Sequence, residues 1–181
     1  MTKNLYLVVG KSGVGKDYVV NKLCERMNLT KVISHTTRPQ RQGETNTHYF
    51  VSQEEFDSLK DFMVAYTHFN GFDYGTTADV VNQSDIYIID VDGIRYLKKH
   101  HDKLSRPIVI IGISADGTLR FNRMIKRNDS FSEAAQRFMN DNVSFLNWEG
   151  QVDATFDNSK DGDNCVDEVE RFIRSKEEEQ A

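Results

Sequence analysis

A glycine-rich segment near the start of the chain combines the residue types and the spacing of a phosphate-binding loop. The sequence GKSGVGK follows a short apolar run at residues 5–9 and precedes apolar residues at helical spacing. Glycines let successive backbone N–H groups face one anion, and a helix N-terminus adds partial positive charge. The final lysine can reach the β- and γ-phosphates of a nucleoside triphosphate. We therefore expect a catalytic lysine within an ATP-binding loop made of Gly10, Lys11, Ser12, Gly13, Val14, Gly15 and Lys16.

The residue after this lysine departs from the usual pattern. A serine or threonine commonly stands there and binds magnesium, whereas this chain has Asp17. A carboxylate also serves a hard cation, directly or through water. It equally stabilises a helix N-terminus without any metal. Both interpretations stay open, and we expect Mg²⁺ to accompany ATP, with Asp17 and, through water, Asp90 as its candidate ligands.

A polar segment at residues 34–44 contains two arginines, Arg38 and Arg41, on either side of Pro39 and Gln40. A guanidinium group grips a phosphate through two parallel hydrogen bonds. Two such groups three residues apart can converge on one dianion. A polar loop with incidental charges is the alternative interpretation.

The elements that must position these residues follow from the apolar pattern. Short β-branched runs at residues 5–9, 86–90 and 108–113 predict strands buried on both faces, and residues 152–156 predict a weaker fourth. Helical spacing predicts three apolar faces, formed by Val19, Val20, Leu23 and Met27, by Phe138, Met139, Val143 and Leu146, and by Val166, Val169, Phe172 and Ile173. Strands that alternate with helices predict an α/β fold with a mainly parallel sheet and flanking helices.

Residues 33–77 differ from this core. They are polar, with a short strand expected at residues 49–52 and a small helix at residues 54–59. We interpret them as a lobe inserted into a single domain that spans residues 1–181, with its core at about 1–32 and 78–175. The charge and aromatic content of this lobe favour a binding surface.

Bulk composition limits the classes of partner. The chain has 181 residues, of which 38% are hydrophobic and 28% charged, and its formal net charge is −5. This balance is typical of a globular domain, and the negative charge does not favour nucleic-acid polymers or anionic membranes. Two cysteines without CxxC spacing predict no disulfide framework. With no signal-peptide pattern and no apolar run near the roughly 18 residues that span a bilayer, we expect a cytoplasmic protein.

Several motifs together resemble the guanylate kinase family over nearly the whole chain. The segment SHTTRPQRQGE is similar to the family's SxTTRxxRxGE, YFVS followed by EF resembles another family segment, and YGT and DVDG resemble two more. The resemblance implies a P-loop kinase fold with an acceptor-binding lobe at about 33–77 and a short lid at about 120–137. It also implies ATP-dependent phosphorylation of GMP or dGMP to GDP or dGDP.

The resemblance also implies roles for individual residues. Arg127 and Arg137 of the lid would approach the transferring phosphoryl group, and Asn158 would lie on the ATP side. Small nucleotides would then be the partners. The GMP-binding set would comprise four residues at the phosphate and three at the guanine, namely Arg38, Arg41, Tyr49 and Tyr74, then Ser34, Thr76 and Asp92.

Two positions depart from the family. The glutamate that accepts hydrogen bonds from guanine aligns with Val64, which cannot accept them, and Asp92, His68 or Thr67 are the residues that would compensate. A deletion also allows His48 to take the place given to Tyr49. If residue 64 lies beside the base, we expect this chain to select guanine less strictly than a family member with the glutamate. Val64→Glu would then sharpen the preference for guanine.

Other functions remain open on the sequence alone. A kinase of another small acceptor is one, either a broad (d)NMP kinase or one similar to ribose 1,5-bisphosphate phosphokinases, although the latter lack the TTRxxRxGE pattern. A non-catalytic interaction module is the other, and such modules characteristically lose the lysine that this chain retains as Lys16.

Overall fold

A parallel four-stranded sheet forms the centre of the computed structural model, which describes residues 3–40, 44, 47–69, 71–104, 106–127, 129–146 and 148–179. The strand order is β6 (Ile86–Ile88), β1 (Leu5–Val9), β7 (Ile108–Ser114) and β8 (Ala154–Asp157). Each neighbouring pair runs parallel. The predicted α/β fold is therefore confirmed.

Both faces of this sheet are buried, which explains why its strands lack alternation of polar and apolar residues. Alternate residues of β1 enter two separate clusters. Leu5, Leu7 and Val9 pack in one cluster, and Tyr6 and Val8 pack in the other. The sheet therefore divides the core into two halves.

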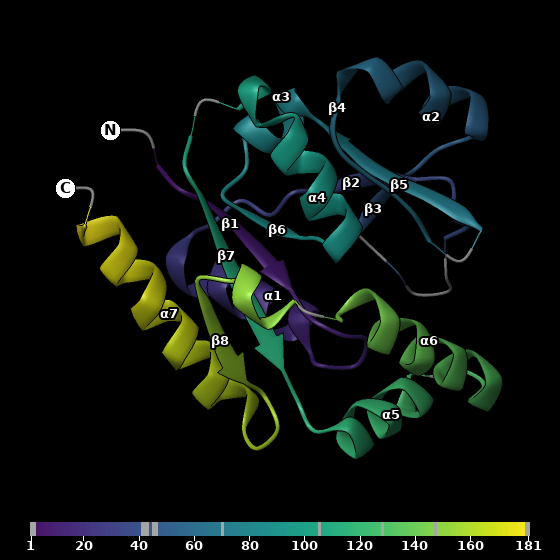
Figure 1. Cartoon of the computed structure of the whole chain (residues 1–181). Coiled ribbons are helices and arrows are strands. Elements are labelled where there is room, and N and C mark those ends of the chain that lie inside the picture. Colours follow the sequence, from purple (N-terminus) through teal and green to yellow (C-terminus); the bar gives the residue numbers. More distant parts are fainter. Residues whose placement is uncertain are drawn as a thin grey trace.

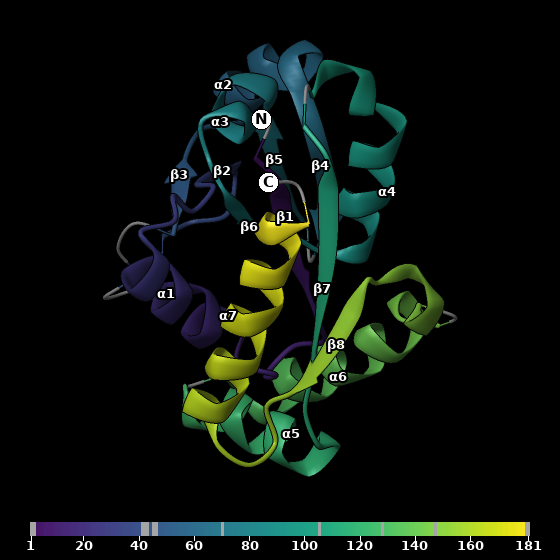
Figure 2. The same ribbon diagram turned by 90° about the vertical axis from the view of Figure 1, so that its left-hand side faces the viewer.

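Helices cover the two faces of the sheet. α1 (Lys16–Met27) and α7 (Gly162–Glu178) lie on one side, and α3 (Ala78–Asn82) and α4 (Val91–Lys99) lie on the other (Figures 1 and 2). The predicted apolar faces of α1 and α7 do pack into the core. Among the described residues, no helix is long and apolar enough to cross a membrane.

The strands β6 and β7 end at other residues than the sequence predicts, and β8 is shifted along the chain. β6 stops at Ile88 rather than at residue 90, because Asp90 already serves as the N-cap of α4 and accepts the Gly93 N–H at 2.7 Å. β7 continues to Ser114. β8 begins at Ala154 rather than at residue 152.

The inserted lobe has a small sheet of its own, with the order β3 (His48–Phe50), β2 (Ser34–Thr36), β5 (Phe72–Thr77) and β4 (Met63–Phe69). β2 and β3 are parallel, and the other pairs are antiparallel. The expected strand at residues 49–52 is shorter and earlier, because Ser52 caps α2 (Gln53–Leu59) in a reciprocal capping box with Glu55. A 3₁₀ turn, Lys60–Phe62, joins α2 to β4.

Two helices, α5 (Gly117–Lys126) and α6 (Phe131–Ser144), lie below the lobe in Figure 1, and further 3₁₀ turns occur at His101–Lys103 and Glu149–Gln151. The predicted lid at 120–137 corresponds to parts of both helices. The apolar face predicted for α6 is wrong. Met139, Val143 and Leu146 are exposed by 69%, 77% and 68%, whereas Ala134 and Asp141 face inward.

Candidate active site

The phosphate-binding loop joins β1 to α1, and its glycines are required by its geometry. Gly13 and Gly15 have φ angles of 79° and 93°, in the left-handed region that favours glycine. A Cβ atom on Gly13 would lie 2.4 Å from the Arg120 carbonyl oxygen, and one on Gly15 would lie 2.4 Å from Asn158 Nδ2. Side chains are therefore excluded at both positions, and the loop backbone stays close to its neighbours.

Lys16 begins α1 and folds back over the loop. Its Nζ donates to the carbonyl oxygens of Gly10 at 2.6 Å and Lys11 at 3.2 Å. Burial lowers the pKa of Lys16 from its ordinary value, and the charges of Asp17 and Asp141 partly oppose that shift. The ammonium group thus lies within the loop, where an entering anion would replace carbonyl partners.

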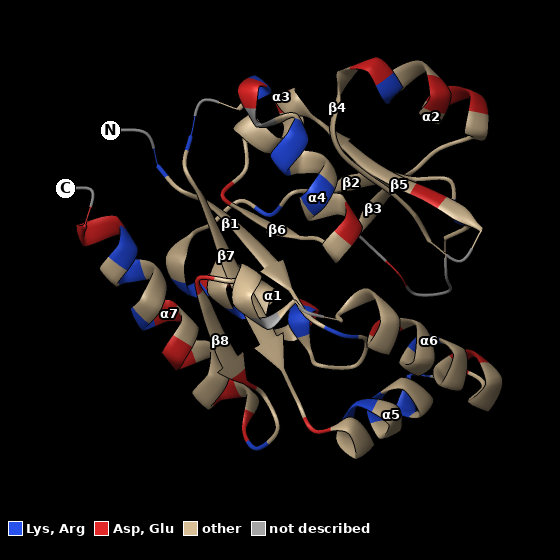
Figure 3. Cartoon of the chain, viewed as in Figure 1, with Lys and Arg blue, Asp and Glu red and all other residues tan. Residues whose placement is uncertain are grey.

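Basic residues of α5 support the loop from the lid side, and Figure 3 shows Lys and Arg gathered on this helix. Arg123 donates to the Val14 carbonyl at 3.2 Å and to the Asn158 carbonyl at 3.0 Å. Asn158 Nδ2 in turn donates to the Val14 carbonyl at 2.7 Å. Asn158, assigned to the ATP side, is buried and fixes the shape of the loop.

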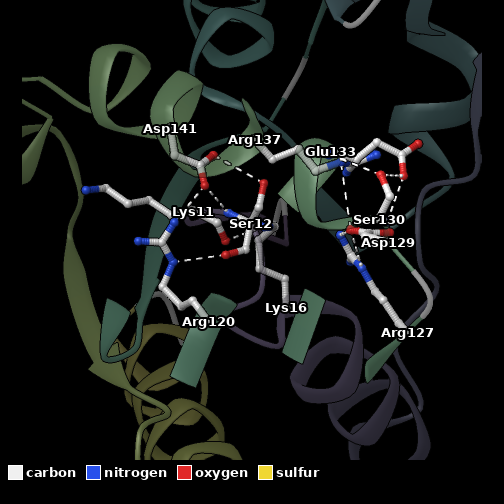
Figure 4. Close-up of polar contacts among 10 residues, drawn as sticks. All are labelled: Lys11, Ser12, Lys16, Arg120, Arg127, Asp129, Ser130, Glu133, Arg137 and Asp141. Atoms are coloured by element: carbon white, nitrogen blue, oxygen red, sulfur yellow. Dashed lines mark hydrogen bonds and ion pairs between the residues drawn. The ribbon is translucent and has the colours of Figure 1, made fainter. Parts of the chain in front are cut away.

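The two arginines predicted to lie in a lid, Arg127 and Arg137, meet at one carboxylate. Arg127 donates through Nε and Nη2 to Asp129 Oδ2, at 3.1 and 2.8 Å, and Arg137 Nε lies 3.9 Å from the same oxygen. Figure 4 shows this group on one side of Lys16 and a second group, around Asp141, on the other. The structure therefore brings the two predicted residues together beside the loop.

Sequence reasoning missed Asp141 and the role of Arg120. These residues form an ion pair at 2.7 Å that also contacts Ser12 of the loop. Residues 12 and 141 are far apart in the sequence, so no local pattern reveals the contact. Helical spacing gives one signal, because Asp141 lies three residues after Phe138 and seven after Ala134 and therefore shares their face of α6.

A cavity of about 140 Å³ lies between the lobe sheet and the core sheet. Its lining includes Ser34, His48, Thr67, Tyr74, Tyr87 and Asp90. Ser34 Oγ lies 2.8 Å from His48 Nδ1, and the His48 and Tyr74 rings pack edge to face at 5.7 Å. Hydroxyl, imidazole and carboxyl groups therefore converge on an aromatic-walled space that suits a small polar ligand.

His48 and Tyr49 of β3 are the two candidates for one acceptor-binding position, and the alternation of side chains along the strand separates them. His48 lines the cavity, whereas Tyr49 points to the other side of the strand, 51% exposed and 5.1 Å from the His35 ring. Burial lowers the pKa of His48, and the positive charge of Arg38 lowers it further. The geometry thus favours His48 at this cavity.

Asp90 and Asp92 have different surroundings. Asp90 lines the cavity, and burial raises its pKa, with the Gly93 N–H acting in the opposite direction. The Asp92 side chain is 62% exposed and pairs with Arg95 at 2.7 Å. Asp92 does not line this cavity, so among these two carboxyl groups Asp90 is the one placed to contact a ligand in it.

Val64 does not occupy the position expected of it. Its side chain is fully buried in the core cluster that contains Val9 and Val81. The β4 residues that line the cavity are instead Ala65, Tyr66, Thr67 and Phe69. The pairing of β4 with β5 shifts register between Met63 and Ala65, which a sequence alignment without gaps cannot represent.

Of the other lobe residues predicted to bind the acceptor, Arg38 and Thr76 are described by the structure and do not line this cavity. Arg38 bonds Glu44 Oε1 through Nη2 at 2.7 Å and lies over the Phe50 ring at 5.5 Å. Thr76 is fully buried and its hydroxyl has no hydrogen-bond partner among the described residues. Arg41 lies outside the described residues.

The metal ligands expected from the sequence fit a hard cation only in part. Asp17 is exposed in the first turn of α1, and the half-buried Asp90 lines the cleft that also contains Lys16. No group of three or more His, Cys, Asp or Glu forms a metal cluster in the described part of the chain. Mg²⁺ bound with donor phosphates needs only one or two protein carboxylates, so this pair is consistent with it.

The sequence matches the model of the guanylate kinase family over residues 2–176. A guanylate kinase of Mycoplasmopsis pulmonis (strain UAB CTIP) is 34% identical over 146 residues, which cover 72% of this chain and 74% of that protein. A guanylate kinase of Neisseria meningitidis serogroup A is 44% identical over 84 residues, which cover 44% of this chain. The chain spans about two-fifths of the length of that Neisseria relative, 41%.

Solved structures show the same fold. The crystal structure of a guanylate kinase from Anaplasma phagocytophilum has a TM-score of 0.67 and 23% identity, covering 97% of this chain and 86% of that one. That of a gluconokinase from Sinorhizobium meliloti 1021 has a TM-score of 0.60 and 12% identity, covering 99% and 96%. Because the family model spans nearly the whole chain, and because the Mycoplasmopsis relative is 34% identical over most of both proteins, this chain belongs to the guanylate kinase family.

Proposed function

We propose that this chain is a nucleoside monophosphate kinase that transfers the γ-phosphoryl group of ATP to GMP or dGMP. The observation that supports this proposal most is that the cavity of the lobe and the cleft beside Lys16 share part of their lining. Thr67, Phe69 and Asp90 line both the cavity beside Tyr74 and a cleft of about 220 Å³ beside Lys16. A monophosphate in the cavity and a triphosphate tail in the cleft would meet along this wall.

On the donor side, the backbone N–H groups of the P-loop and Lys16 would bind the ATP phosphates. Lys16 would exchange its carbonyl partners for phosphate oxygens. Arg127 and Arg137, already joined through Asp129, would stabilise charge on the transferring group when the lid closes. Mg²⁺ bound with ATP, near Asp17 and Asp90, would neutralise phosphate charge.

On the acceptor side, the cavity would bind the base, and the arginines, together with His48 and Tyr74 of the cavity wall, would bind the phosphate. An oxygen of the acceptor phosphate would bond to the γ-phosphorus while the bond to the bridging oxygen of ADP breaks. Closure would exclude water, which otherwise competes as acceptor. The residues proposed for this side are Ser34, Thr67 and Asp90 at the base, and Arg38, Arg41, His48 and Tyr74 at the phosphate.

A broader (d)NMP kinase is the second candidate, and the β4 wall of the cavity favours it. Ala65 and Thr67 stand there, so Asp90 is the only carboxylate among the described residues that line the cavity. A site that lacks one hydrogen-bond acceptor discriminates less between bases, by about 1–3 kcal/mol when the site is dry.

A coupled assay that follows ADP formation tests both proposals. Purified protein is supplied with ATP and Mg²⁺ and with each of the ribo- and deoxynucleoside monophosphates in turn. Turnover with GMP and dGMP alone supports guanylate kinase activity, and comparable kcat/KM for AMP, IMP or pyrimidine monophosphates supports the broader activity. Binding of ATP without turnover of any monophosphate would contradict both.

A further inference from the structure

A carboxylate of α6 contacts the part of the P-loop proposed to receive donor phosphates. Ser12 donates its backbone N–H to Asp141 Oδ2 at 2.8 Å, and its Oγ lies 3.3 Å from Asp141 Oδ1. Figure 4 shows this carboxylate between Ser12 and Arg120. One internal anion therefore occupies both hydrogen-bond donors of Ser12.

Arg120 of α5 holds this carboxylate in place. Its Nη2 donates to Asp141 Oδ2 at 2.7 Å, its Nε donates to the Ser12 carbonyl at 2.9 Å, and its guanidinium lies 4.8 Å from the centre of the Phe138 ring. The Arg120 and Asp141 side chains are only 5% and 10% exposed. Charge-assisted hydrogen bonds between buried groups are short and directional. The ring of contacts therefore joins the loop, α5 and α6 in one arrangement.

Asp141 also faces the space that the donor would fill. It lines the same cleft as Lys16 and Asp90, and its negative charge acts on Lys16. The next residue of α6 adds a second contact with the loop, because Lys11 Nζ donates to Asn142 Oδ1 at 3.3 Å. Two consecutive residues of α6 thus contact two consecutive residues of the P-loop.

We propose that Asp141 is an internal competitor of the donor phosphates and thereby sets the affinity for ATP. Carboxylate and phosphate oxygens both only accept hydrogen bonds, so they compete for the Ser12 N–H and hydroxyl. The carboxylate also repels a polyphosphate that enters the same cleft. Entry of ATP therefore requires α6 to release Ser12, which couples donor binding to lid movement. This inference rests on the proposed function, because it takes ATP as the ligand.

The test is the dissociation constant for Mg²⁺-ATP, measured by isothermal titration calorimetry on wild type and Asp141→Asn. We expect the variant to bind ATP roughly tenfold more tightly, the equivalent of one charge-assisted hydrogen bond. Its KM for ATP should fall while its KM for GMP stays unchanged. Asp167→Asn is the matched control, since Asp167 is a carboxylate of α7 that pairs with Arg26 of α1, and its ATP affinity should equal that of wild type.

Stability needs a separate check, because Asp141→Asn leaves Arg120 buried without its charge partner. Thermal unfolding is measured for each variant. The ATP dissociation constants are also compared between Arg120→Met and Arg120→Met/Asp141→Asn, because neither of these proteins contains an unpaired Arg120. If Asp141→Asn leaves ATP binding unchanged or weaker both in wild type and in Arg120→Met, the inference is overturned. The ion pair of Arg120 and Asp141 then only stabilises the fold. Absence of ATP binding in wild type and in every variant overturns the proposed donor site and this inference with it.

Discussion

The donor side and the acceptor side of this site are built in different ways. The proposed donor side centres on one continuous loop, whose backbone would face the donor phosphates and which contains two glycines in the left-handed conformation. The proposed acceptor cavity is lined by residues from β2, β3, β4, β5, β6 and the segment after β6. A backbone site is defined by its local sequence, whereas a side-chain site depends on the register of every strand. Substitutions that act on one side and leave the other intact test this difference.

The largest effect is expected at Lys16. Lys16→Ala should lower turnover by roughly 10²–10³, because it removes a charged donor aimed at the transferring phosphoryl group. The fold should persist, since the ammonium group contacts only loop carbonyls. Steady-state kinetics with circular dichroism measures both. Near-normal turnover in a folded variant would contradict the donor-site assignment.

The next effect concerns stability rather than turnover. Val64→Glu places a carboxylate in the apolar core, so we expect a loss of about 3 kcal/mol in the free energy of unfolding instead of a sharper guanine preference. Urea denaturation measures it, and Thr67→Glu, on the cavity wall, is the matched control with a smaller loss. A stable Val64→Glu protein with improved selectivity for guanine would show that residue 64 lies at the acceptor cavity and not in the core.

These two positions also illustrate what the sequence could predict. The P-loop, Lys16 and the buried parallel strands were predictable because each depends on neighbouring residues. Val64 was misplaced because β4 shifts register at that point. The contact between Ser12 and Asp141 could not be predicted, because it joins the P-loop to α6 across 129 residues of the sequence. The exposed Met139 and Val143 show the same limit, since helical spacing identifies an apolar face without saying whether another element covers it.

A smaller effect should separate Asp90 from Asp92. Asp90→Asn is expected to lower kcat/KM for GMP by roughly 10–100-fold, the range for a hydrogen bond to a charged group. Asparagine retains the N-cap of α4, so the fold should be preserved. Asp92→Asn, at an exposed position, should change kcat/KM less than about threefold. The opposite pattern in the GMP assay would assign recognition of the base to Asp92.

The smallest expected effect tests which side chain of β3 faces the acceptor. His48→Phe keeps a ring against Tyr74 but removes the nitrogens that can bond Ser34 or a ligand. Loss of one neutral hydrogen bond is worth about 1 kcal/mol, so KM for GMP should rise about fivefold while KM for ATP is unchanged. Tyr49→Phe is the control, because its hydroxyl lies on the exposed side of the strand and its removal should alter neither constant. The two residues are adjacent, so both variants alter the same strand, and the contact within the cavity is made by His48 alone of the two. A rise in the GMP KM for Tyr49→Phe alone would show that β3 presents its other face to the acceptor.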